Sequence, residues 1–215
     1  MQRAEKVPDR SGFVRENASV PRSYMLPCLL AVMMFLNGGA GLAFSGHLSV
    51  LTITSGYSEE TAAAAVSVFG FTLFLGKFAA GWLADRFGSR KSSVFLITVF
   101  ILGCFNVFGM NGKQVFWCLM LTAMLGFGAS IYNVGPPLWA ADFSTPERYG
   151  KTLRWLQIFY NLGGIVFTIV PGYIADHTSE YRSSYIMFAF MMTASMAILL
   201  YLYRVSKNDV SPDRK

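Results

Sequence analysis

Residues 81–91 read Gly-Trp-Leu-Ala-Asp-Arg-Phe-Gly-Ser-Arg-Lys. This short charged segment separates two apolar stretches, which we place at Thr61–Ala84 and Ser92–Met110. The hydrocarbon core of a bilayer is about 30 Å thick, so a helix needs about 20 mostly apolar residues to cross it. Both stretches are close to that length. The charged segment is therefore predicted to be a tight turn between two membrane-spanning helices.

Four further apolar stretches of similar length flank this pair, at Tyr24–Ser45, Gln114–Ala140, Leu153–Ala175 and Ser183–Tyr203. The chain has 215 residues, of which 53% are hydrophobic and 14% are charged, whereas soluble domains carry about 25% charged residues. We therefore expect an all-α polytopic membrane protein, with six transmembrane helices over residues 24–204. Residues 1–23 and 205–215 are polar and are predicted to be tails.

The basic residues are unevenly divided between the two sides of this arrangement. Of 18 Lys and Arg residues, most lie in the tails or in the two loops on their side, namely Arg86, Arg90 and Lys91, and Arg148, Lys151 and Arg154. The opposite loops hold only Lys113 and Arg182. Because short cytosolic loops retain an excess of Lys and Arg, we expect a multi-pass protein of the plasma membrane with both termini in the cytosol.

Several classes of function are excluded by what the sequence lacks. Cys28, Cys104 and Cys118 each stand alone in an apolar stretch, and His47 and His177 are the only histidines. No zinc-binding pattern is possible, and no metal or cofactor is expected. The net charge of +6 is scattered, so a nucleic-acid partner is not expected. No Asp, Glu or His falls inside a predicted span to act as a general base, so we expect no enzyme.

Small residues cluster at matching places in the first and fourth spans, at Asn37–Gly41 and Gly126–Pro137. Equivalent positions in two groups of three helices are typical of inverted three-helix repeats, in which interrupted helices point to a substrate path. Glycine also lets helices pack closely in lipid, and for the glycines we favour that interpretation. The adjacent prolines Pro136 and Pro137 are predicted to kink or end the fourth helix.

Three polar side chains in these clusters, Asn37, Tyr132 and Asn133, need hydrogen-bond partners in a region without bulk water. Hydrogen bonds between helices would satisfy them, and so would a polar cavity that they line. The sequence leaves both alternatives open.

Lys77 is the one charged residue that we place inside a span, since Arg154, at the edge of the fifth stretch, is counted with the loop charges. It lies about 12 Å along the helix from Asp85, at about 1.5 Å per residue. A charge at this depth costs about 3 kcal/mol and usually faces a bundle interior or a water-filled path. The alternative is that its long side chain extends to the headgroups. Since we place no acidic residue in the spans, an anionic substrate, such as a carboxylate, would supply the counter-charge.

The segment Gly81–Lys91 resembles the G-x-L-x-D-R-x-G-x-[RK]-[RK] signature of the major facilitator superfamily, with Ser89 where that family more often has Arg or Lys. Complete members have two six-helix halves, so the chain resembles one half. The passages Gly46–Ser58 and Gly163–Tyr181 resemble the C-terminal half. The implied fold is six transmembrane helices in two inverted three-helix repeats.

Lys77 precedes Gly81 by four residues, where the oxalate/formate antiporter and monocarboxylate transporter families carry an Arg that binds the substrate carboxylate. Leu73 stands where monocarboxylate transporters carry an Asp, and Lys offers a point charge in place of a bidentate fork. The resemblance thus implies a secondary transporter, antiporter or symporter, for small organic anions, with a monocarboxylate favoured over a dicarboxylate.

The resemblance also assigns residues to roles in alternating access. The expected substrate-binding residues are Lys77, Asn37, Tyr132, Asn133, Gln157 and Asn161. The expected conformational-switch loop consists of Gly81, Asp85, Arg86, Gly88, Arg90 and Lys91. Within this loop, Asp85 is expected to accept from backbone N–H groups of a neighbouring helix or to pair with Arg86 or Arg90.

A transport path between two halves cannot be enclosed by six helices alone. Besides the lipid bilayer and the anion, we therefore expect a second six-helix half or a second copy of the chain as a partner. The alternative is a truncated membrane protein without transport activity.

Overall fold

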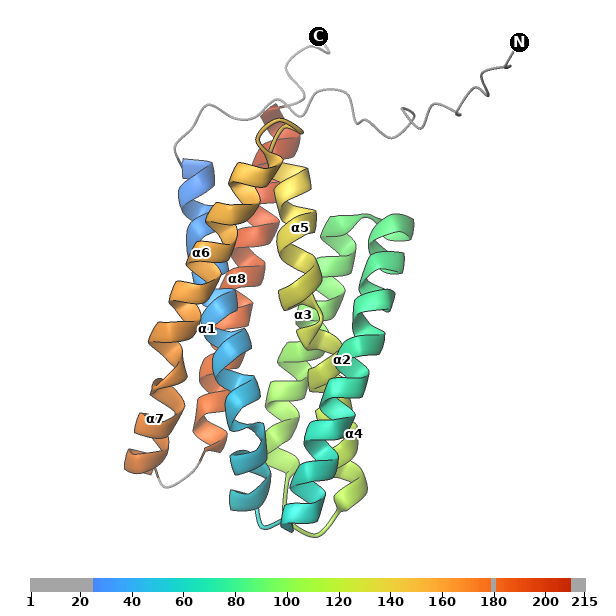
Figure 1. Cartoon of the computed structure of the whole chain (residues 1–215), viewed down its shortest axis with the longest axis vertical. Helices are drawn as coiled ribbons and strands as arrows, with labels where there is room; N and C mark the ends of the chain where they lie inside the picture. Colours follow the sequence, from blue (N-terminus) through green and yellow to red (C-terminus); the bar gives the residue numbers. More distant parts are fainter. Residues whose placement is uncertain (1–24, 179–180, 210–215) are drawn as a thin grey trace, which may run out of the picture.

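Six long apolar spans run through the part of the chain that the computed structural model describes, residues 25–178 and 181–209 (Figure 1). The helices are α1 (Met25–Thr54), α2 (Glu59–Phe87), α3 (Ser89–Asn106), α4 (Val115–Ala129), α5 (Ile131–Phe143), α6 (Tyr149–Thr168), α7 (Val170–Thr178) and α8 (Arg182–Asp209), with a 3-10 turn η2 (Val107–Gly109) after α3. Two spans are each built from a pair of helices, α4–α5 and α6–α7. The expected all-α architecture is confirmed.

The helices extend beyond the predicted stretches. α1 continues past Ser45 and contains His47, and α5 continues past Ala140 and contains Asp142. The expectation that no Asp or His lies within a span is therefore wrong. α8 continues through residue 209, so it includes part of the stretch assigned to the C-terminal tail. The predicted N-terminal tail, residues 1–23, lies outside the described residues.

The turn predicted at residues 81–91 is a single residue between two helices. α2 begins after Ser58, whose side chain accepts a hydrogen bond from the backbone N–H of Thr61 at 3.2 Å. It ends at Gly88, whose N–H donates to the Ala84 carbonyl and whose φ of 87° favours glycine. α3 begins at the next residue. The second glycine of the signature is therefore required by backbone conformation.

The fourth span is interrupted before Pro136 and Pro137, whereas the sequence predicts a kink or an end at the prolines. The break between α4 and α5 is at Ser130, and α5 continues through Pro136 and Pro137 to Phe143. Proline removes a backbone donor, and its ring crowds the carbonyl four residues earlier. The disturbance therefore falls in the turn before the prolines, where the Ser130 N–H donates to Phe127 three residues back at 3.3 Å.

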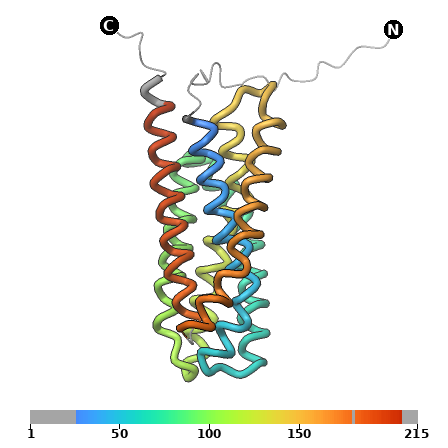
Figure 2. Tube along the Cα trace, turned by 90° about the vertical axis from the view of Figure 1, so that its left-hand side faces the viewer, coloured from blue at the N-terminus to red at the C-terminus, as the bar shows by residue number. Residues whose placement is uncertain are grey.

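The two groups of three helices pack in a reciprocal way. α1 packs on α6 and α8, and α4 packs correspondingly on α2 and α3. Figure 2 shows α1 between α8 and α6. The first helix of each group thus contacts the second and third helices of the other group, as an inverted two-fold repeat requires. α1, α3 and α6 begin, and α2, α5 and α8 end, at one end of the bundle, which we call the terminal end.

Glycines set the closest approach between the two groups. A Cβ built on Gly38 would overlap the backbone carbonyl of Tyr160 on α6, and a Cβ on Gly163 would overlap the carbonyl of Phe35 on α1. α1 and α6 therefore touch backbone to backbone, as small residues permit in membranes.

Glycines also set the closest approach of α4 to α2 and α3. A Cβ on Gly126 of α4 would lie 2.5 Å from the Phe69 carbonyl oxygen of α2, and a Cβ on Gly128 would lie 2.5 Å from the backbone nitrogen of Phe100 of α3. These glycines serve close helix packing, which is the interpretation that the sequence favoured.

We predict that Gly38→Val and Gly163→Val each destabilise the bundle by about 1–3 kcal/mol, because the added side chain forces α1 and α6 apart. The matched control is Gly46→Val on the same helix as Gly38, since a Cβ at Gly46 would meet nothing within 4 Å. Thermal unfolding of the purified protein in detergent measures the effect. Equal melting temperatures for all three variants would contradict the close contact.

Candidate functional site

Two of the six spans are buried by the rest of the protein much less than the other four. Only 17% of the most apolar window of α2 and 22% of that of α6–α7 are buried, against 44–56% for the other four spans. Figure 1 shows α2 and α6–α7 on opposite sides of the bundle, with α1 and α5 between them. The bundle therefore leaves large surfaces of two helices without protein neighbours among the described residues.

Lys77 lies on an open side of α2. It follows Phe74 by three residues and Gly70 by seven and precedes Gly81 by four, so these residues share one side of the helix. Lys77 is exposed, and a Cβ built on Gly70 or Gly81 would meet nothing within 4 Å. Within residues 25–178 and 181–209, the Lys77 amine has no hydrogen bond or ion pair. The two glycines leave room beside it.

The other exposed flank of α2 is bulky and apolar. It consists of Phe71, Leu75, Phe78 and Trp82, which recur at helical spacing and are all exposed. Such a flank suits lipid tails or an apolar partner helix. Phe74, on the side of Lys77, packs edge to face against Phe78 at 4.9 Å, so this apolar flank borders the side that carries Lys77.

Polar residues form a stripe along one side of α6. Arg154, Gln157 and Asn161 follow one another at intervals of three and four residues, and all are exposed. The Asn161 side-chain nitrogen donates to the Gln157 carbonyl at 2.7 Å, and Arg154 Nε donates to the Gly150 carbonyl at 3.2 Å. From the sequence, Arg154 is predicted to be a loop charge. Its spacing of three residues from Gln157 is the signal in the sequence that could have assigned it to the same side of the helix.

The neighbouring flank of α6 is apolar. Trp155, Leu162 and Val166 lie on it, and each is exposed by 45–53%. α6 thus separates a polar stripe from an apolar flank, as α2 does. On α5, Asn133 is also exposed.

Two predicted binding residues lie inside the bundle. Asn37 is 1% exposed, and its side-chain nitrogen donates to Ser195 Oγ of α8 and to the Met33 carbonyl. Tyr132 is 6% exposed, and its ring packs edge to face against Phe100 at 5.3 Å. Asn37 therefore ties α1 to α8, and neither side chain reaches the exposed flanks in this structure.

The expected ion pairs of the switch loop do not form among the described residues. Asp85 is exposed, and neither Arg86 nor Arg90 pairs with it. The guanidinium of Arg86 instead lies over the rings of Trp82 and Phe87, at 5.5 and 5.9 Å from their centroids. A partner for Asp85 would have to come from outside the described residues.

A different polar link joins three helices at the terminal end. The Tyr203 hydroxyl of α8 donates to Asp142 Oδ2 of α5 at 2.5 Å and lies 2.9 Å from Ser89 Oγ at the start of α3. Ser89, the residue that departs from the family signature, therefore makes a neutral contact where a cation is more common. This link could not be predicted from the sequence, because Asp142 lies outside the apolar stretch that ends at Ala140.

Comparisons with known proteins agree with this architecture. Residues 29–215 match the family model described as the Major Facilitator Superfamily. The chain is 28% identical over 121 residues to the uncharacterized transporter YclF of Bacillus subtilis, covering 54% of the chain and 24% of the relative. It is 23% identical over 154 residues to the alpha-ketoglutarate permease of Bacillus subtilis, covering 71% and 35%.

A third relative is synaptic vesicle glycoprotein 2A of Homo sapiens, which is 29% identical over 106 residues, covering 47% of the chain and 14% of the relative. The matched regions thus span between about a seventh and about a third of the length of these relatives.

The two flanks of α6 can be distinguished by their contact with water. We predict that Asn161→Cys reacts with a membrane-impermeant methanethiosulfonate at least about ten-fold faster than Leu162→Cys in native membranes, because the reactive thiolate needs a polar environment. Both variants carry Cys28→Ser, since Cys28 is exposed, whereas Cys104 and Cys118 are buried. Equal rates at the two positions would show that the polar stripe faces lipid.

Proposed function

The chain belongs to the major facilitator superfamily, and on that premise we propose that it forms one half of a secondary transporter that moves small organic anions by alternating access. Members of this family are transporters, and we propose no enzymatic activity. The observation that carries the proposal is the Lys77 amine, which has no ion pair among residues 25–178 and 181–209 and lies on an open side of a membrane-spanning helix.

The surroundings of Lys77 favour an anion as its partner. A charge within a span costs about 3 kcal/mol unless water, a counter-charge or the headgroups receive it. Gly70 and Gly81 leave space for a ligand beside Lys77, and the amine forms no ion pair within the described part of the chain. A carboxylate supplies both the negative charge and acceptors for the ammonium donors.

The other exposed polar residues would complete the site. We propose that Asn133 on α5 and Gln157 and Asn161 on α6 donate hydrogen bonds to the substrate from helices other than that of Lys77. Asn37 and Tyr132 are left out of the site because both are buried. Arg154 extends the polar stripe toward the terminal end, about 10 Å along α6 from Asn161, where it would attract an anion entering from that side.

The proposed class of substrate follows from the single positive charge that Lys77 supplies. A single amine without a bidentate fork favours a monocarboxylate, as the family resemblance suggests. The relative named alpha-ketoglutarate permease supports a carboxylate as the general class. We therefore propose small monocarboxylates first and dicarboxylates second.

A second half is needed to enclose the path. α2 and α6 lie at opposite edges of the bundle, with α1 and α5 between them (Figure 1), and we propose that a second six-helix half, or a second copy of the chain, covers the sides that carry Lys77 and the polar stripe of α6. Asp85 would then find its partner on that half and release it when the path opens. Arg86, Arg90, Lys91, Arg148 and Lys151 lie near the terminal end, which we accordingly propose to be cytosolic, in the plasma membrane.

The proposal is tested by uptake of labelled short-chain carboxylates into vesicles that contain the chain and any partner half that co-purifies with it. We predict that Lys77→Gln lowers kcat/KM by about 10- to 100-fold, since a hydrogen bond to a charged group is worth about 1.5–3 kcal/mol. Lys77→Arg is expected to retain uptake because it keeps the charge. Lys113→Gln, in the loop at the other end, is the matched control.

The outcomes separate the alternatives. Uptake that is equal in the native chain and Lys77→Gln would remove Lys77 from the mechanism. No uptake by the native chain, alone or with a partner half, would favour the truncated membrane protein without transport activity.

A further inference from the structure

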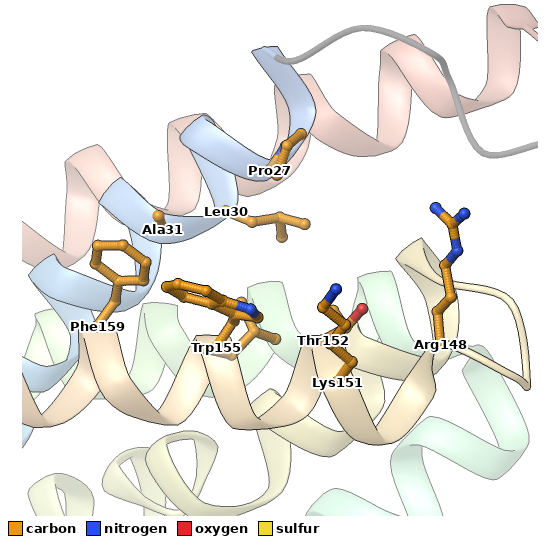
Figure 3. A pocket seen from close by; sticks show the side chains of 9 residues that line it. Pro27, Leu30, Ala31, Arg148, Lys151, Thr152, Trp155 and Phe159 are labelled. Atoms are coloured by element: carbon orange, nitrogen blue, oxygen red, sulfur yellow. The ribbon is translucent and has the colours of Figure 1, made fainter.

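A wedge-shaped cavity of about 460 Å³ opens between α1 and α6 near the terminal end (Figure 3). Its origin is the glycine contact described above. α1 and α6 touch where Gly38 meets Tyr160 and Gly163 meets Phe35, and the two helices separate toward the terminal end (Figure 1). The cavity is therefore a consequence of the helix crossing.

The cavity has an apolar wall and a basic mouth. Pro27 and Leu30 of α1 face Trp155 and Phe159 of α6, whereas Arg148 and Lys151 lie at the beginning of α6 (Figure 3). None of the lining residues that the structure describes is acidic. A ligand that fits this arrangement has a negatively charged end and an apolar body.

The cavity is on a different side of α6 from the proposed substrate path. Trp155 belongs to the apolar flank of α6, with Leu162 and Val166, whereas Gln157 and Asn161 belong to the polar stripe. A dissolved carboxylate in the path would therefore not reach Phe159 and Leu30. The apolar flank instead suits lipid tails.

The depth of the residues also suits a lipid. Basic residues at the end of a membrane-spanning helix lie at headgroup level, and tryptophan is enriched at the same membrane–water interface. Phe159 lies about 12 Å farther along the helix than Lys151 and about 17 Å farther than Arg148, at about 1.5 Å per residue, which is within the hydrocarbon region. α6 begins without a side-chain cap, so its first N–H groups add positive potential at the mouth.

We propose that this cavity binds an anionic phospholipid from the leaflet at the terminal end. Arg148 offers a bidentate contact to the phosphate and Lys151 offers a second cation. One acyl chain lies between Leu30 and Trp155 and extends to Phe159. Basic pockets between transmembrane helices are suited to such headgroups. The lipid would hold α1 and α6 at their observed separation on the side away from the substrate path.

The test is native mass spectrometry of the purified full chain titrated with phosphatidylglycerol or with phosphatidylcholine. We expect tighter binding of phosphatidylglycerol, and binding roughly 30-fold weaker in Arg148→Gln/Lys151→Gln, from the loss of two cations near the headgroup. The matched control is Arg90→Gln/Lys91→Gln, which removes two exposed cations from the same end of the bundle. Ala31→Phe, which narrows the apolar wall and keeps both cations, is expected to displace the lipid.

Each remaining outcome would overturn the proposal. Equal weakening in the two double variants would indicate attraction to the general surface charge. Retained binding in Ala31→Phe, with native helicity by circular dichroism, would place the lipid elsewhere. Displacement by millimolar inorganic phosphate would indicate a site for free anions. Loss of the lipid when a partner half is bound would show that protein covers the cavity.

Discussion

The structure depends on backbone contact between helices at glycine positions. The bilayer core contains no water that could hydrogen-bond to unpaired backbone groups. Apolar helices also gain no hydrophobic free energy by leaving lipid for each other, so they associate through close packing. Gly38 and Gly163 bring α1 and α6 into contact, and Gly126 and Gly128 do the same for α4 with α2 and α3. Because the two sets are reciprocal, they fix the six spans as two inverted groups of three.

This packing leaves α2 and α6 covered on one side only, and each exposed surface is divided. On α2, Lys77 and small residues lie apart from Phe71 and Trp82. On α6, Asn161 lies apart from Trp155. One helix can therefore border a polar path on one flank and lipid on the other. The proposed transport site and the proposed lipid cavity use different flanks of α6 and can fail independently.

The sequence was sufficient for features that depend on length and composition. The six spans follow from apolar stretches, and the turn at Gly88 follows from the charged segment around it. The direction in which a polar side chain points could not be predicted, because helix rotation is set by packing between distant segments. Asn37 is thus buried against Ser195, while Asn133 is exposed. Helix ends were equally uncertain, so Asp142 and Arg154 were assigned to loops although they lie within α5 and α6.

The most direct test of the central claim is a cryo-electron microscopy structure of the chain in lipid nanodiscs, with any partner half that co-purifies, and with a short-chain carboxylate added. The measured quantity is the position of Lys77 Nζ. The account predicts that this atom lies within about 3 Å of a carboxylate oxygen, in a polar space that Asn133, Gln157 or Asn161 also borders. Density that places the amine among acyl chains or at the headgroups, with no polar space beside it, would contradict the account.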